Sequence, residues 1–114
     1  IIRKFAAGTP QIKAVACFDY EGFIIAKALV EEVIIEDILL LAGSMMSQSS
    51  VIGKSLKISS LTDFTITSET AKITVKKAGE VLILVYYGKD VKEGLMKFNL
   101  NKLADDIKTV ADKC

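Results

Sequence analysis

Two segments of this chain are apolar on both faces of an extended strand. They are Lys13–Asp19 (KAVACFD) and Val81–Tyr87 (VLILVYY). Side chains of a strand alternate between its two faces, so such a strand must have both faces covered. We therefore expect these two strands to be neighbours at the centre of one sheet, with helices packed on both sides.

Two other segments alternate between apolar and polar residues, as half-exposed strands do. In Leu61–Ser68 (LTDFTITS) and Lys72–Lys77 (KITVKK), the side chains expected to face the core are Phe64, Ile66, Ile73 and Val75. Those expected to face outward are Asp63, Thr65, Thr67, Lys72, Thr74 and Lys76. A fifth strand, Phe23–Leu29, follows the turn residues Asp19-Tyr20-Glu21-Gly22 and forms a hairpin.

Helical periodicity predicts three helices. Ile1–Ala7 reads as the last turns of a first helix, Ile35–Lys54 as a long central helix, and residues from about Val91 to the end as the last one. The order is α-β-β-α-β-β-β-α. The fold class is therefore α/β (α+β): a single five-stranded antiparallel sheet flanked by helices on both faces. The chain begins Ile1-Ile2-Arg3 without Met, so we expect upstream residues and a first helix that is truncated.

Composition excludes several classes of function. The 114 residues fit a single domain, 1–114. A formal net charge of +1 gives no field to hold nucleic acid, and no apolar run is long enough to insert into a membrane. Two cysteines, Cys17 and Cys114, make no disulfide framework, which favours reduced thiols and a cytoplasmic location.

The sequence shows no set of catalytic residues, so we expect no enzyme, no cofactor and no metal. It contains no His, the commonest general base and metal ligand. The Gly53-Lys54-Ser55 segment has the end of a phosphate-binding loop, but Gln48 stands where its first Gly is required. Paired acids such as Glu36-Asp37 flank the start of a helix, where the helix dipole favours them.

The central helix Ile35–Lys54 has more apolar surface than one sheet contact needs. Plotted as a helix, its core stripe comprises Ile35, Ile38, Leu39, Ala42, Met45, Met46 and Ile52. Its outer side carries small or apolar residues instead of charges: Leu40, Gly43, Ser44, Ser47, Ser50 and Val51, with Leu41 on a flank. Either residues of the same chain, such as the loop Ser55–Ser60, cover this side, or another molecule contacts it.

The strand Leu61–Ser68 is a second candidate contact. It carries the acid Asp63 with the polar residues Thr65 and Thr67, and it has no Lys or Pro to block pairing. A sheet edge without such protection can pair with the same strand of a second copy.

The order and spacing of these segments resemble the Roadblock/dynein light-chain family, which shares its general architecture with longin and profilin domains. The resemblance rests on the hairpin "AVACFDYEGFIIAKAL", the helix "EDILLLAGSMMSQSSVIGKSL" and the block "FTITSETAKITVKKAGEVLILVYYGKDVKEGLMKFNLNKLADDI". It implies a homodimer that joins two sheets at Leu61–Ser68 and sets the helices Ile35–Lys54 side by side.

The resemblance also implies a function as a regulator or scaffold of a small Ras-like GTPase. Such a platform can act without catalytic residues by ordering the switch loops of the GTPase. Arg3 is the only Arg in the chain, which argues against an arginine finger. An alternative function is a sensor of similar architecture that binds a small ligand between sheet and helix. The aliphatic core positions favour a filled interior and argue against such a ligand.

Overall fold

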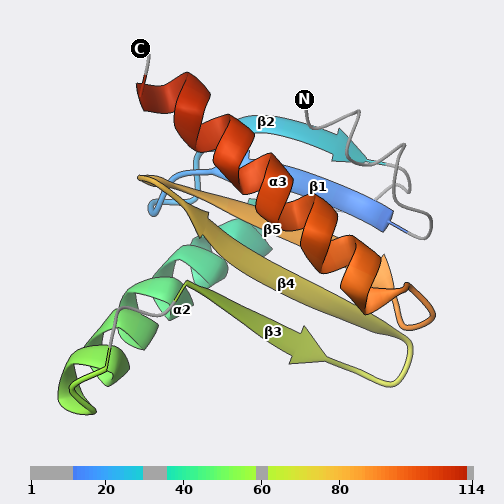
Figure 1. Cartoon of the computed structure of the whole chain (residues 1–114). Helices are drawn as coiled ribbons and strands as arrows, with labels where there is room; N and C mark the ends of the chain where they lie inside the picture. The colour runs from blue at the N-terminus through green and yellow to red at the C-terminus, as the bar shows by residue number, and fades with distance from the viewer. Residues whose placement is uncertain (1–11, 30–35, 59–61, 113–114) are drawn as a thin grey trace.

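The computed structural model describes residues 12–29, 36–58 and 62–112 (Figure 1). Five strands and two helices lie in these ranges: β1 (Ile12–Phe18), β2 (Ile24–Leu29), α2 (Glu36–Ser55), β3 (Asp63–Thr67), β4 (Ala71–Ala78), β5 (Val81–Gly88) and α3 (Glu93–Asp112). Each of these strands and helices begins and ends within two residues of the position that the sequence predicts. The helix expected over Ile1–Ala7 lies outside the described residues.

The five strands form one antiparallel sheet in the order β2-β1-β5-β4-β3. The central position of β1 and β5 is confirmed, with Val15 opposite Val85 in the register that pairs them. Both strands are buried on both faces, as their continuous apolar sequences predict. β2 and β3 are the two outermost strands of the sheet among the described residues.

Each face of the sheet has its own apolar core. On one face, Val15, Cys17 and Val85 pack against Met96 and Leu100 of α3. On the other face, the alternate residues of β1 and β5 pack against α2 together with a residue of β4. This second core comprises Ala16, Phe18, Val75, Leu82 and Leu84 with Leu39, Ala42 and Met46 of the helix. Cys17 is buried, and burial raises the pKa of its thiol.

The first half of α2 is held against the β1–β2 turn by close backbone contact. A Cβ added at Gly43 would overlap the carbonyl oxygen of Tyr20. Gly22, with a φ of 90°, lies beneath the backbone of Leu40, where a Cβ would come within 3.0 Å of the Leu40 Cα. The Asp19 carboxylate fixes the turn by accepting hydrogen bonds from the backbone N–H groups of Glu21 and Phe23.

The second half of α2 extends beyond the sheet and past β3 (Figure 1). The expected core stripe is therefore wrong for Met45 and Ile52, whose side chains are 41% and 54% exposed. Leu39, Ala42 and Met46 are buried as expected. The periodicity of the helix continues after Met46, but none of the strands in the described ranges lies beneath that part of it. In the part of the chain that is described, neither helix is both long and apolar enough to span a membrane.

Candidate interaction surface

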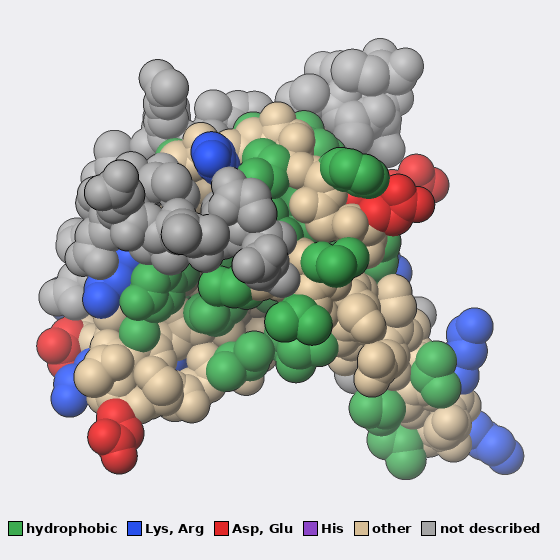
Figure 2. Space-filling view, turned by 180° about the vertical axis from the view of Figure 1, so that it is seen from behind, with side chains coloured by type: hydrophobic (Ala, Val, Ile, Leu, Met, Phe, Trp, Pro, Cys, Tyr) green, Lys and Arg blue, Asp and Glu red, His purple; other side chains and the backbone are tan. Residues whose placement is uncertain are grey.

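Residues 47–58, here called the α2 arm, carry apolar side chains that face solvent. Figure 2 shows the arm projecting from the body of the molecule, with apolar side chains along it and lysines at its end. Val51 is 62% and Leu56 63% exposed, and Ile52 and Ile58 are also exposed. Apolar residues gathered on a projecting element mark an interaction surface more strongly than isolated ones do.

The end of the arm has a defined conformation. Lys57 adopts a left-handed backbone with a φ of 58°. The N–H of Ile58 then donates to the carbonyl of Gly53 at 3.0 Å, and the N–H of Lys57 donates to the carbonyl of Lys54 at 3.2 Å. These two bonds form a Schellman motif, which satisfies the last carbonyls of the helix. The motif holds Leu56 and Ile58 in place on the surface.

Serine hydroxyls along α2 bond within the helix. Ser47, Ser49 and Ser50 donate to the carbonyl oxygens of Gly43, Met45 and Met46, four residues earlier. Because these hydroxyls already have acceptors, burying them against another surface leaves no hydroxyl proton unpaired. The small serine side chains therefore allow a second backbone to approach the helix closely.

The residues expected on the outer side of α2 differ in their exposure to solvent. Leu40, Leu41, Ser44, Ser47 and Val51 are exposed, and Ser50 is half-buried. Gly43 does not belong with them, since it is buried against Tyr20. The expectation that Gly43 lies on the outer side is therefore wrong, because the β1–β2 turn covers that position of the helix.

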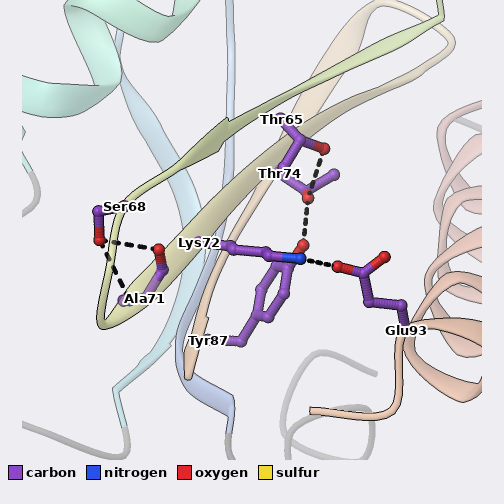
Figure 3. Close-up of polar contacts among 7 residues, drawn as sticks. All are labelled: Thr65, Ser68, Ala71, Lys72, Thr74, Tyr87 and Glu93. Atoms are coloured by element: carbon purple, nitrogen blue, oxygen red, sulfur yellow. Dashed lines mark hydrogen bonds and ion pairs between the residues drawn. The ribbon is translucent and has the colours of Figure 1, made fainter. Parts of the chain in front are cut away.

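At the β3 edge, Asp63, Thr65 and Thr67 lie opposite Lys76, Thr74 and Lys72 of β4. All three β3 residues are exposed, as expected. Thr74, expected to face outward, is instead buried and only 1% exposed. Its hydroxyl lies 3.0 Å from that of Thr65 and 2.8 Å from the buried hydroxyl of Tyr87 (Figure 3). Thr74 is buried because it supplies the partner that Tyr87 needs inside the core.

An ion pair joins β4 to the start of α3. The Lys72 ammonium bonds the Glu93 carboxylate in the first turn of the helix (Figure 3). The hydrogen bond to Glu93 raises the pKa of Lys72, and the same bond lowers the pKa of Glu93. Both groups are therefore charged at neutral pH and tie the β4 side of the edge to α3.

A groove of about 300 Å³ lies between the first half of α2 and the β3–β4 hairpin, and we call it the β3 groove. Its lining comprises Ile38, Ile66, Ser68, Thr70, Ala71, Ile73, Leu84 and Tyr86. Ile66 was expected in the core, but it is 45% exposed. Its side chain lines the β3 groove together with Ile73 and Tyr86, so it lies on the expected face of the sheet but is only partly covered.

Within the described ranges, no group of three or more acidic or cysteine side chains is arranged to hold a metal ion. A second, more open hollow lies beside the β1–β2 and β4–β5 turns and is lined by Asp19, Glu21, Lys77 and Glu80 among others. The Asp19 carboxylate in that hollow already accepts hydrogen bonds from two backbone N–H groups of the turn. The apolar arm, the β3 edge and the β3 groove are therefore surfaces suited to bind a partner.

No protein-family model and no curated protein sequence matches the chain. Solved structures do match it. The Roadblock/LC7 domain from Streptomyces avermitilis superposes with a TM-score of 0.88 at 11% identity, covering 96% of this chain and 93% of that one. The fold is that of a Roadblock/LC7 domain.

Two MglB structures have the same Roadblock fold. The gliding protein MglB from Thermus thermophilus gives a TM-score of 0.89 at 14% identity, covering 99% of this chain and 87% of that one. An MglB with a tetrameric arrangement also gives 0.89, at 16% identity, with coverage of 98% and 85%. At these identities the likeness concerns the fold.

Sequence reasoning missed part of the exposed apolar surface of this Roadblock fold. Met45 and Ile52 were expected in the core, and Leu56 and Ile58 lie just beyond the expected end of the helix. A signal was present for the last two. Leu56 and Ile58 stand on either side of Lys57, just after the helix stop at Gly53, where a loop rarely carries large apolar residues.

Proposed function

We propose that this chain is a non-catalytic protein-binding module of the cytoplasm, which forms a homodimer and regulates or scaffolds a small Ras-like GTPase. One observation carries the proposal: α2 leaves its own sheet and presents a projecting apolar arm. An isolated helix half with Val51, Ile52, Leu56 and Ile58 in water is costly unless a partner covers it.

The position of the arm favours a second copy of this chain as that partner. Because the arm passes β3, a copy paired along β3 would bring its own sheet beneath the arm (Figure 1). The β3 strand has alternating exposed side chains and no Lys or Pro, which suits strand pairing. The tetrameric arrangement described for one MglB structure supports self-association of this fold.

The GTPase part of the proposal rests on the resemblance to Roadblock proteins and on the chemistry of the surface. The partner would supply the catalytic residues, and this chain would hold the switch loops in one conformation. Such an effect requires only that one nucleotide state of the GTPase binds more tightly than the other.

Sedimentation velocity of the purified chain tests the homodimer. We expect a dimer at micromolar concentration, which corresponds to a binding free energy of about −8 kcal/mol. A monomer at that concentration would contradict the self-association part of the proposal.

Titration with purified Ras-like GTPases from the source genome tests the second part. Each GTPase is loaded with GDP or with a non-hydrolysable GTP analogue, and binding is measured by calorimetry. We expect one GTPase to bind with affinities that differ between the two nucleotides, and the rate of GTP hydrolysis or of nucleotide exchange then assigns the effect. Absence of binding in both nucleotide states across the set would contradict a GTPase partner.

A small-ligand sensor remains the competing function, and the β3 groove is the observation that favours it. Its volume of about 300 Å³ lies at the lower end of the range for ligand sites. A thermal-shift screen with nucleotides and apolar metabolites separates the two functions. A ligand that raises the melting temperature and is lost on Ile73→Trp, which would fill the groove, would favour the sensor.

A further inference from the structure

A β-bulge in β1 changes the face on which its first residues lie. In the register between β1 and β5, Ile12 pairs with Tyr87 and Ala14 pairs with Tyr86. Lys13 is therefore an extra residue, and it shifts the alternation of the strand. As a result Ile12 packs in the core on the α3 face, although strict alternation from Ala14 would place it on the α2 face. Bulges of this kind re-aim a side chain and are frequent next to functional sites.

The bulged lysine lies beside the β3 groove. Its ammonium is over the ring of Tyr86, with the Lys13 Nζ 5.3 Å from the ring centroid. Tyr86 is also one of the residues that line the groove. The cation–π contact therefore holds a positive charge next to an apolar hollow. An ammonium has three N–H donors, so it can bond an anion while it stays over the ring.

The groove itself is suited to an apolar body. Its walls are formed mainly by Ile38, Ile66, Ile73 and Leu84. Among the described residues that line it, none carries a charge. At its hairpin end, the Ser68 hydroxyl donates to the Ala71 carbonyl oxygen at 2.9 Å and accepts from the Ala71 N–H at 3.1 Å (Figure 3). That hydroxyl already serves the hairpin, so the ammonium of Lys13 is the group better placed to orient a ligand.

We propose that the β3 groove binds a medium-chain fatty acid, with the apolar chain along the isoleucines and the carboxylate beside Lys13. One ammonium matches the single charge of a carboxylate, whereas a phosphate monoester carries a charge of about −2 and would leave part of it uncompensated. The groove volume of about 300 Å³ equals that of roughly ten liquid water molecules, which suits a chain of medium length. This site depends neither on the proposed self-association nor on a GTPase partner.

Methyl NMR tests the site with octanoate as the probe. The protein is labelled at its isoleucine methyl groups and titrated with octanoate below the concentration at which octanoate forms micelles. We expect saturable shifts of the Ile66 and Ile73 signals, and no shift of Ile83, which is buried in the core on the α3 face. Shifts confined to the exposed Ile52 and Ile58 of the α2 arm, or no saturable shift at all, would overturn the proposal.

Matched comparisons test the charge. Octanol has the same chain without the carboxylate, and it should bind about tenfold more weakly, as expected for the loss of a charge-assisted hydrogen bond. Lys13→Met should remove this difference between the two ligands, and Lys13→Arg should retain it. Lys102→Met, at an exposed lysine of α3, should leave the difference unchanged. Equal binding of octanol and octanoate to the unmodified chain would show only an apolar crevice and would refute the fatty-acid site.

The same titration of Ser47→Arg separates this site from self-association, because that substitution should block a close contact between copies. Circular dichroism first confirms that each variant is folded. Octanoate shifts of Ile66 and Ile73 in this variant support the site whether or not a second copy covers the groove in the unmodified chain. Absence of saturable shifts in both proteins refutes the site and leaves the groove to a protein side chain. A monomeric unmodified chain that binds octanoate contradicts the self-association alone.

Discussion

Gly43 of α2 lies against the backbone of Tyr20, so closely that a Cβ at position 43 would overlap the Tyr20 carbonyl oxygen. The contact joins the buried half of α2 to the β1–β2 turn, and that turn is itself held by the Asp19 carboxylate. The small residue at this position therefore serves the packing of the protomer.

Gly43→Ala should destabilise the protein by about 1–3 kcal/mol, because backbone must move to admit the methyl group. Gly94→Ala is the matched control. Gly94 lies in α3 with nothing within 4 Å of its added Cβ, so alanine should stabilise the helix by up to about 1 kcal/mol. Urea denaturation of both variants checks the opposite signs, and a neutral Gly43→Ala would contradict the packing role.

The hydroxyls of Thr74 and Tyr87 predict an asymmetric pair of substitutions. Thr74→Val leaves the buried Tyr87 hydroxyl without its partner and should cost about 1–3 kcal/mol. Tyr87→Phe leaves Thr74 bonded to Thr65 and should cost about 1 kcal/mol. The double variant should be no less stable than Thr74→Val alone. Equal losses for the two single variants would indicate that the hydroxyl of Tyr87 finds another partner.

The Lys72–Glu93 ion pair predicts a pH dependence of stability. The pKa of Glu93 is lowered from its ordinary 4.5, so its contribution is present above that value and is lost as the pH falls through the lowered pKa. The pKa of Lys72 is raised from 10.5, so its contribution is present below that value and is lost as the pH rises through the raised pKa.

Glu93→Gln should therefore lower the urea midpoint slightly at neutral pH. The effect is small because both side chains are partly exposed and screened by solvent. The difference from the unmodified chain should vanish at a pH below the lowered pKa of Glu93. A difference that persists unchanged in acid would point to a role of Glu93 at the helix start that does not depend on its charge.

Ser47→Arg and Met46→Arg should separate association from folding. Ser47 is exposed at the start of the arm, so Arg is tolerated in the protomer but should block a closely approaching helix and abolish a micromolar contact. The neighbouring Met46 is 1% exposed, and Arg there should unfold the domain. Circular dichroism and sedimentation are measured on both variants. A folded Ser47→Arg protein that remains dimeric and binds the same GTPase would show that this part of the helix is only a solvated surface.

The sequence by itself determined which two strands are central, and it indicated β3 as an edge strand. Continuous apolar runs in β1 and β5 require cover on both faces, and this requirement is local to each strand. The alternation of β3 likewise predicted a strand with one exposed face, and the topology places it at the edge. The exposure of Leu40, Leu41, Ser44, Ser47 and Val51 on α2 was also predicted by pattern, whereas Gly43 is buried.

Only the tertiary structure decided which apolar residues have something to pack against. Helical periodicity places Met45, Ile52 and Met46 on one stripe, but the stripe is buried only as far as the sheet extends beneath it. Ile66 likewise follows the expected alternation, but it is exposed beside the β3 groove. Thr74 and Gly43 were both expected to face outward and are both buried, for a related reason. Thr74 lies against the buried hydroxyl of Tyr87 on β5, and Gly43 lies against the β1–β2 turn. Burial depends on residues far apart in the chain, and a local pattern carries no information about where they come together.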